Sequence, residues 1–278
     1  MQVAGAFEPA LFQNHLVRLT GAPRARLLFW GSCAMGRLPI SFVLVLALLT
    51  ASCGDDPGSL HQSAKDGELQ AVQEFLAGGA HIDEQDGGGF TPLHAAIMHG
   101  HPQLTRYLIA QGADVNVAAI YGVTPLHVAE DADTVRLLLE KGARVDAWSK
   151  TRGTPLHAAV NGNSLQAVQL LLESGAALDV GDVNGSTALH HAAGKGRNAV
   201  VALLVDAGAA VDASNEFYFT PLHWAAGNGH GGVVALLVDS GASIGLKSHD
   251  GLTPQDLARA KGHADVVRIL AIRGTDPS

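Results

Sequence analysis

Residues 91–116 read TPLHAAIMHGHPQLTRYLIAQGADVN, and the start of this stretch recurs along a chain of 278 residues. Thr-Pro-Leu-His, or a variant of it, begins at Thr91, Thr124, Thr154, Thr187, Thr220 and Thr253. These starting points lie 33, 30, 33, 33 and 33 residues apart, and counting 33 residues back from the first reaches Gly58. A sustained period of this length is typical of proteins built from stacked structural repeats. The sequence therefore predicts seven units in one array.

Each unit carries the signals of two short helices. Threonine can cap a helix, and proline is tolerated in the first turn because its missing amide hydrogen is not needed there. A glycine such as Gly100 can end this helix in the left-handed conformation, and Asn163 stands at the same position in the fourth unit. Apolar residues at three- and four-residue spacing, for example Val200, Leu203 and Leu204, then predict a second helix. A polar, glycine-rich stretch leads from this helix to the next Thr-Pro.

The pattern resembles the ankyrin-repeat family over residues 58–278. The resemblance implies an all-α repeat solenoid of stacked helix-turn-helix units, in which hairpin-like fingers join each unit to the next. One unit cannot bury its apolar face alone, so neighbouring units supply the core. The first unit lacks Thr-Pro and the last replaces Leu-His by Gln255-Asp256, which is typical of capping repeats. The predicted units are 58–90, 91–123, 124–153, 154–186, 187–219, 220–252 and 253–278.

Fourteen histidines raise the question of a metal site. Equivalent residues of neighbouring units in a stacked array lie about 8–10 Å apart, whereas zinc ligands lie about 2.0–2.2 Å from the metal, so no metal site is expected. Histidines recur instead at the fourth position of the units. The resemblance implies that these residues hydrogen-bond the adjoining finger and form a structural frame, whose members are His94, His127, His157, His190 and His223.

Composition and motifs exclude several classes of function. With only Cys33 and Cys53, neither a cysteine-based zinc site nor a disulfide framework is expected. A net charge of −8 gives no electrostatic reason to expect a nucleic-acid partner. The sequence has no Gly-x-Ser-x-Gly elbow, phosphate-binding loop or HExxH motif. We therefore expect no catalytic residue, no enzyme activity, no cofactor and no small-molecule substrate.

An apolar run without charges covers residues 38–52, LPISFVLVLALLTAS. Its length falls short of the roughly 20 residues that a membrane-spanning helix needs, and it fits the apolar region of a signal peptide. Arg37 precedes the run, and the small residues Ala51 and Ser52 stand directly before Cys53. Residues 35–52 therefore resemble a bacterial lipoprotein signal peptide. A plain secretory signal, a membrane anchor and a buried helix are the alternatives.

The lipoprotein resemblance implies cleavage before Cys53 and attachment of an acyl anchor to that residue. Residues 1–34 then form an upstream extension, because signal peptides usually have about 15–30 residues, and residues 53–57 form a tether. From Cys53 onward the chain has 14 Lys and Arg against 25 Asp and Glu, a net charge of −11. We expect a lipid-anchored protein of the bacterial cell envelope that faces the periplasm. A soluble exported protein and a cytoplasmic protein are the alternatives.

Aromatic residues gather in the predicted fingers of a chain that is only 5% aromatic. Three of them precede Thr220, and the middle one stands where other units have a turn glycine. Exposed aromatic side chains are typical anchors of protein interfaces. Packing of these rings on neighbouring fingers is the alternative. The predicted partner-binding aromatic residues are Tyr121, Trp148, Phe217, Tyr218 and Phe219.

The third unit, 124–153, is three residues shorter than its neighbours. The shortage lies between its two predicted helices, around residues 130–133, where a neutral change in a loop would explain it. Its finger contains Lys150 and Arg152, and its turn glycine, Gly153, is displaced by one position. These two cations form a basic spot in an acidic chain, which either contacts a carboxylate on a partner or is a solvated fingertip.

These observations favour a non-catalytic scaffold that binds another protein on the concave side formed by the fingers and the first helices. An inhibitor or immunity-type protein that blocks a toxin or an enzyme is an alternative, because the acidic charge suits a basic target. A cytosolic or host-directed repeat protein is a further alternative if the signal is not processed.

Overall fold

The computed structural model describes residues 58–273. All the regular elements in this range are helices, which confirms the expected all-α solenoid. The predicted upstream extension 1–34, the predicted signal peptide 35–52, the predicted tether 53–57 and the predicted attachment residue Cys53 lie outside the described residues. The helices are α2 (Leu60–Asp66), α3 (Leu69–Ala77), α4 (Pro92–Met98), α5 (Pro102–Ala110), the 3-10 turn η1 (Ile120–Gly122), α6 (Pro125–Val128), α7 (Ala132–Glu140), α8 (Pro155–Gly162), α9 (Leu165–Glu173), α10 (Ala188–Gly194), α11 (Asn198–Asp206), α12 (Pro221–Gly227), α13 (Gly231–Asp239), α14 (Pro254–Ala260) and α15 (Ala264–Arg273).

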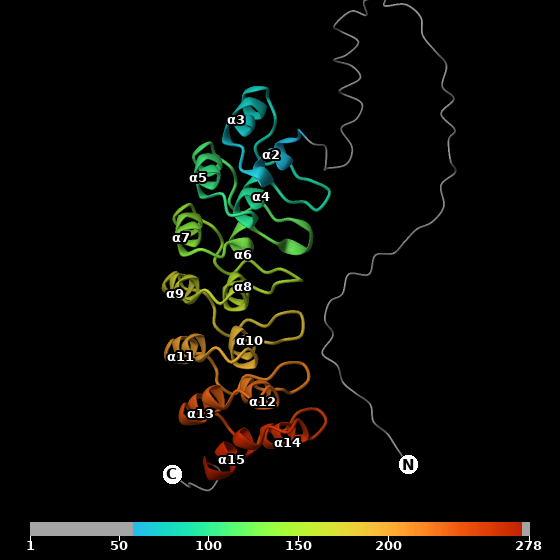
Figure 1. Cartoon of the computed structure of the whole chain (residues 1–278), viewed down its shortest axis with the longest axis vertical. Helices are drawn as coiled ribbons and strands as arrows, with labels where there is room; N and C mark the ends of the chain where they lie inside the picture. The colour runs from blue at the N-terminus through green and yellow to red at the C-terminus, as the bar shows by residue number, and fades with distance from the viewer. Residues whose placement is uncertain (1–57, 274–278) are drawn as a thin grey trace, which may run out of the picture. The chain divides into compact units, whose positions relative to one another are not determined.

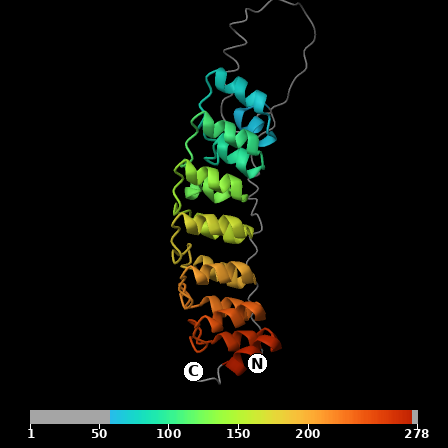
Figure 2. The same ribbon diagram turned by 90° about the vertical axis from the view of Figure 1, so that its left-hand side faces the viewer.

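The helices of the repeat array form two columns, shown in Figure 1. The even-numbered helices from α2 to α14 are the first helices of the units and form one column, and the odd-numbered helices from α3 to α15 form the other. Figure 2 shows the successive helix pairs stacked one above another. Loops project beyond the first helices, away from the second column. We call these loops fingers 1 to 6, which are residues 83–90, 116–123, 146–153, 179–186, 212–219 and 245–252.

The first helices begin as the sequence predicts. Thr91 has extended backbone angles, and its side chain accepts a hydrogen bond from the backbone N–H of His94. The His94 side chain in turn contacts the backbone N–H of Thr91, which makes a reciprocal capping box around Pro92. The helix ends before Gly100, whose φ of 72° is in the left-handed region. In the fourth unit Asn163 adopts the same conformation with a φ of 62°.

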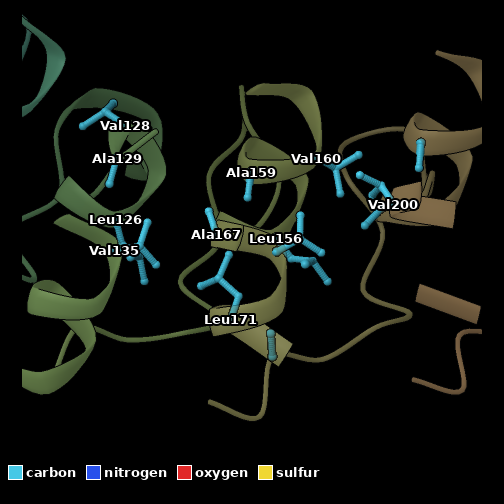
Figure 3. Packing of buried hydrophobic residues seen from close by; sticks show 14 of the residues in the cluster. Leu126, Val128, Ala129, Val135, Leu156, Ala159, Val160, Ala167, Leu171 and Val200 are labelled. Carbon is cyan, nitrogen blue, oxygen red and sulfur yellow. The ribbon is translucent and has the colours of Figure 1, made fainter. Parts of the chain in front are cut away.

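The core is a continuous line of leucine, valine and alanine between the two columns. Leu156 of α8 and Leu171 of α9 are buried, and Val135 of α7 belongs to the same cluster. Figure 3 shows these side chains in the packing of neighbouring units. Because each buried face is completed by the next unit, the core extends through the array instead of forming separate cores.

The three residues missing from the third unit shorten its first helix, whereas a change in the loop between its helices was expected. Its first helix, α6, has four residues, whereas α4 has seven and α8 has eight. The three missing residues therefore shorten a helix by its last turn, and the change is not confined to a loop. Asp131 then caps α7, because its side chain accepts a hydrogen bond of 2.7 Å from the N–H of Thr134. Within residues 58–273, no helix has both the length and the apolar character needed to span a membrane.

Candidate binding surface on the fingers

The frame histidines join each first helix to the finger that follows it. The Nε2–H of His94 donates to the carbonyl of Val123 at 3.1 Å, and that of His190 donates to Phe219 at 2.9 Å. At the other end of the ring, Nδ1 accepts from the backbone N–H of the capping threonine, at 3.1 Å in the Thr187 and His190 pair. The equivalent acceptors for His127, His157 and His223 are the carbonyls of Gly153, Ser186 and Leu252.

This arrangement requires neutral imidazole rings. Nδ1 must accept while Nε2 donates, and an imidazolium has no acceptor. Burial lowers the pKa of His94, His127 and His190 to about 4, although the backbone carbonyl bond to each ring opposes the shift. Burial also lowers the pKa of His157 and His223. The rings are therefore neutral at pH 7.

The last unit retains the bonds to the capping threonine but has no bond from this position to a following finger. Asp256 stands where the other units have the frame histidine, and its Oδ2 accepts from the N–H of Thr253 at 3.1 Å and from its hydroxyl at 2.7 Å. A carboxylate can complete the capping box but cannot donate to a following finger. The replacement thus preserves the helix cap at a position where no further repeat unit is stacked in the described array.

Two further sets of contacts between units were not predicted by sequence reasoning. His101, which follows a helix-ending glycine, donates from Nε2 to the carbonyl of Lys65 at 2.7 Å, in the preceding unit. In the second set, Asp146 accepts from the N–H of Ala177 and Asp212 from that of Ser243, each 31 residues later. The 33-residue period of these residues was the available signal. Among residues 58–273 no three His, Cys, Asp or Glu side chains are placed to hold a metal ion.

The frame holds neighbouring fingers in register, with one backbone bond between their tips. Ile120 of finger 2 donates to Gly88 of finger 1 at 3.0 Å, and Lys150 of finger 3 donates to Tyr121 of finger 2 at 2.9 Å. Between fingers 3 and 4 a side chain makes the link, because the Trp148 Nε1–H donates to the carbonyl of Gly181 at 3.1 Å. Trp148 is thus both a bridge between fingers and an exposed ring.

Four of the five aromatic residues predicted for binding are exposed on the fingers. The exposed fractions are 62% for Tyr121, 47% for Trp148, 52% for Phe217 and 59% for Tyr218. Phe219 differs, because its ring is half-buried and packs edge-on against His223 with ring centroids 5.6 Å apart. The structure therefore brings the first four residues to the finger surface, whereas Phe219 packs inside finger 5.

The two exposed tyrosines, Tyr121 and Tyr218, have backbone angles that favour glycine. Tyr121 has a φ of 67° and Tyr218 a φ of 58°. In finger 5 the side chain of Asn215 holds this turn, since its Oδ1 accepts from the N–H groups of Phe217 and Phe219 at 3.0 Å each. Tyr218 is therefore an exposed tyrosine in a strained backbone conformation, which glycine would adopt without strain.

Sequence reasoning missed four exposed aliphatic residues on the fingers. Ile120 lies beside Tyr121 on finger 2, and its side chain is as exposed as that of Phe217. Val183 on finger 4 and both Leu246 and Leu252 on finger 6 are also exposed. Fingers 2 to 6 therefore each present at least one large apolar side chain to solvent. No aromatic cluster marks these aliphatic positions, so their exposure could be recognised only in the fold.

The predicted basic spot lies on finger 3. Lys150 and Arg152 are both exposed, and Arg152 Nη1 lies 3.5 Å from the carbonyl oxygen of His127. Within the described residues no carboxylate oxygen lies within 4.0 Å of either cation, whereas Arg259 and Arg273 pair with Asp256 and Asp239. The two charges are therefore available to a partner.

Comparisons with known proteins match this architecture. A family model described as ankyrin repeats (3 copies) matches residues 60–148, 131–215 and 207–278. The structure of the human ASB11 ankyrin repeat domain is similar over 81% of this chain and 100% of that one, with 30% identity and a TM-score of 0.71. The ankyrin repeat domain of Bcl-3, a member of the IkappaB protein family, is similar over 78% of this chain and 100% of its own, with 34% identity and a TM-score of 0.64. The curated proteins compared include no match.

Proposed function

Because this chain belongs to the ankyrin-repeat family, we propose that it is a non-catalytic scaffold that binds another protein through its fingers and the adjoining first-helix face. Ankyrin repeats generally mediate protein–protein interaction, and ankyrin-repeat proteins are typically non-catalytic. The proposal extends to export and to an acyl anchor on Cys53, which would present the array on the periplasmic side of a bacterial membrane.

The exposed rings of finger 5 are the observation that carries the binding proposal. Phe217 and Tyr218 are each more than half exposed at neighbouring positions. The left-handed backbone of Tyr218 costs about 1 kcal/mol relative to glycine. Its ring stacks on His249 of finger 6 with the ring centroids 6.5 Å apart, yet 59% of the side chain stays exposed to solvent. An exposed aromatic residue at a strained position is expected where the ring contributes to binding a partner.

Substitution of these two rings tests the binding proposal. We expect Phe217→Ala combined with Tyr218→Gly to lower the yield of co-purified partner by about tenfold or more, since central aromatic anchors contribute about 2 kcal/mol or more to an interface. Glycine suits the positive φ, so the variant should keep the fold. Leu165→Ala removes an exposed apolar side chain at the start of α9 and serves as the matched control. Recovery of the same partners at the wild-type yield would refute the proposed surface.

The anchor proposal rests on the sequence before the described residues. The charge-free run 38–52 ends in two small residues directly before Cys53, which is the arrangement of a lipoprotein signal. We expect metabolic palmitate labelling of the wild-type protein in a bacterial host, an amino terminus at Cys53, and recovery in the membrane fraction. Cys53→Ser should abolish the label, because the thiol is the site of attachment. Equal labelling and fractionation of the two proteins would contradict the anchor while leaving the binding proposal intact.

A further inference from the structure

Finger 3 turns differently from the other fingers. Arg152 stands where fingers 1, 2, 4 and 6 have a turn glycine, and the following residue, Gly153, takes the left-handed conformation with a φ of 68°. A Cβ on Gly153 would lie 2.9 Å from the ring of His157, so only glycine fits there. The displaced turn places the Arg152 guanidinium near the carbonyl of His127, beside the first helices.

Arg152 borders an open hollow of about 640 Å³. Its apolar lining comes from fingers 1 and 2 and from Ala158 of α8, and Thr151 and Asn161 add polar groups. No residue of the shortened α6 lines it. The apolar side chains of the two fingers that line the hollow are Phe90, Ile120, Tyr121 and Val123.

The charge at the hollow is opposite to that of the chain as a whole. Residues 53–278 carry a net charge of −11, yet Arg152 and Lys150 lie at this finger without a carboxylate within 4.0 Å among the described residues. The nearby frame histidine adds no charge, since burial and then the Arg152 charge hold the pKa of His127 low, at about 4. The hollow therefore combines apolar walls with a guanidinium at its edge that bonds a backbone carbonyl but has no carboxylate partner among the described residues.

We propose that this hollow binds an extended segment of a partner protein in which one carboxylate stands beside a large apolar side chain. The apolar side chain occupies the space between Ile120, Tyr121 and Ala158, and the carboxylate pairs with the planar guanidinium of Arg152. The amide of Asn161 can bond the backbone of the segment. This inference rests on the proposed scaffold function and specifies the chemistry of one partner segment.

The overall charge limits the segment to few carboxylates. Screening at physiological salt acts over about 8 Å, so a guanidinium in contact with one carboxylate is little affected by distant acidic groups. A long acidic run would instead meet the −11 charge of residues 53–278 and be repelled. The partner segment is therefore expected to have one acidic residue near its apolar anchor and otherwise neutral residues.

A peptide array tests this specificity with the full-length protein in mild detergent. The probes are immobilised decapeptides of glycine and serine with every residue pair at the two central positions. We expect binding above background for pairs of Asp or Glu with Leu, Ile, Met or Phe. In solution, fluorescence anisotropy of the best peptide should show about fivefold weaker binding when its carboxylate is replaced by the amide.

Two variants assign the contacts. Arg152→Gln should bind the acid and amide peptides equally, and Ala158→Leu, which fills the hollow, should weaken both by about tenfold. Lys247→Gln removes an exposed cation from finger 6 and should behave as wild type.

Three results with peptides would overturn the inference: no peptide above background, an unchanged acid preference in Arg152→Gln, or stronger binding of a phosphoserine peptide than of the carboxylate peptide. A partner whose capture needs Phe217 and Tyr218 but not Arg152 would overturn it and leave the scaffold function standing.

Discussion

At pH 5 the repeat array is expected to be about 3–6 kcal/mol less stable toward unfolding than at pH 7.5, with each of three frame histidines contributing about 1–2 kcal/mol. Burial lowers the pKa of His94, His127 and His190 to about 4, whereas an unfolded histidine titrates near its ordinary value of 6.5. Between these values the unfolded chain binds more protons than the folded chain. Stability is therefore complete above about pH 6.5 and falls as the pH drops toward 4.

Urea denaturation followed by circular dichroism at pH 7.5, 6.5, 5.5 and 5.0 measures this effect. The urea midpoint should fall only slightly between pH 7.5 and 6.5, where the unfolded histidines begin to protonate, and more steeply below pH 6.5. Carboxylates with a lowered pKa, such as Asp256, contribute in the same direction only below about pH 4, outside this window. A midpoint that is unchanged or that rises between pH 6.5 and 5.0 would contradict the neutral, buried state of the frame histidines.

His190→Ala is expected to lower the free energy of unfolding by about 3–4 kcal/mol at pH 7.5, the cost of losing a buried hydrogen-bonding ring. The variant leaves the Phe219 carbonyl and the Thr187 N–H without this partner, and it removes a ring that packs edge-on against Trp224 at 5.8 Å. Because one buried histidine is gone, the loss of stability between pH 6.5 and 5.0 should also shrink by about 1–2 kcal/mol. Urea midpoints at the two pH values measure both effects.

His191→Ala is the matched control for this prediction. His191 is the next residue along α10, but its side chain is 19% exposed and its one side-chain hydrogen bond is to Asp182, at 2.8 Å. Its ring also contacts those of His157 and Trp224, with centroids 5.6 and 5.5 Å away. A partly exposed pair such as His191 and Asp182 contributes about 1 kcal/mol or less. Equal decreases in the free energy of unfolding for the two variants would show that His190 stabilises the array no more than its neighbour His191 does.

The helices and their order could be predicted from the sequence because their causes are local or periodic. Thr-Pro at a helix start and glycine at its end act through neighbouring backbone atoms, as the capping box of Thr91 and the left-handed Gly100 show. Apolar residues at helical spacing required a partner surface, and the 33-residue period showed that the next unit provides it. The third unit departs from the expectation because a count of residues cannot tell a trimmed loop from a lost helical turn.

The candidate surface was only partly predictable, since exposure depends on what the neighbouring unit covers. Phe219 and Phe217 lie two positions apart in one finger, yet one packs against His223 and the other is exposed. Likewise, Trp148 bridges to Gly181 because finger 4 happens to lie beside it. Identical residue types in one short segment therefore have different roles that only their surroundings decide.

The sequence by itself determined the period, the positions of the caps and the frame histidines, because these depend on residue type at fixed spacing. Only the tertiary structure decided what the departures from the period do. The three-residue deficit of the third unit, the displaced Gly153 and the arginine at position 152 are separate irregularities in the sequence. Stacking places finger 3 beside finger 2 and α8, so that Arg152 borders one hollow with side chains from neighbouring units.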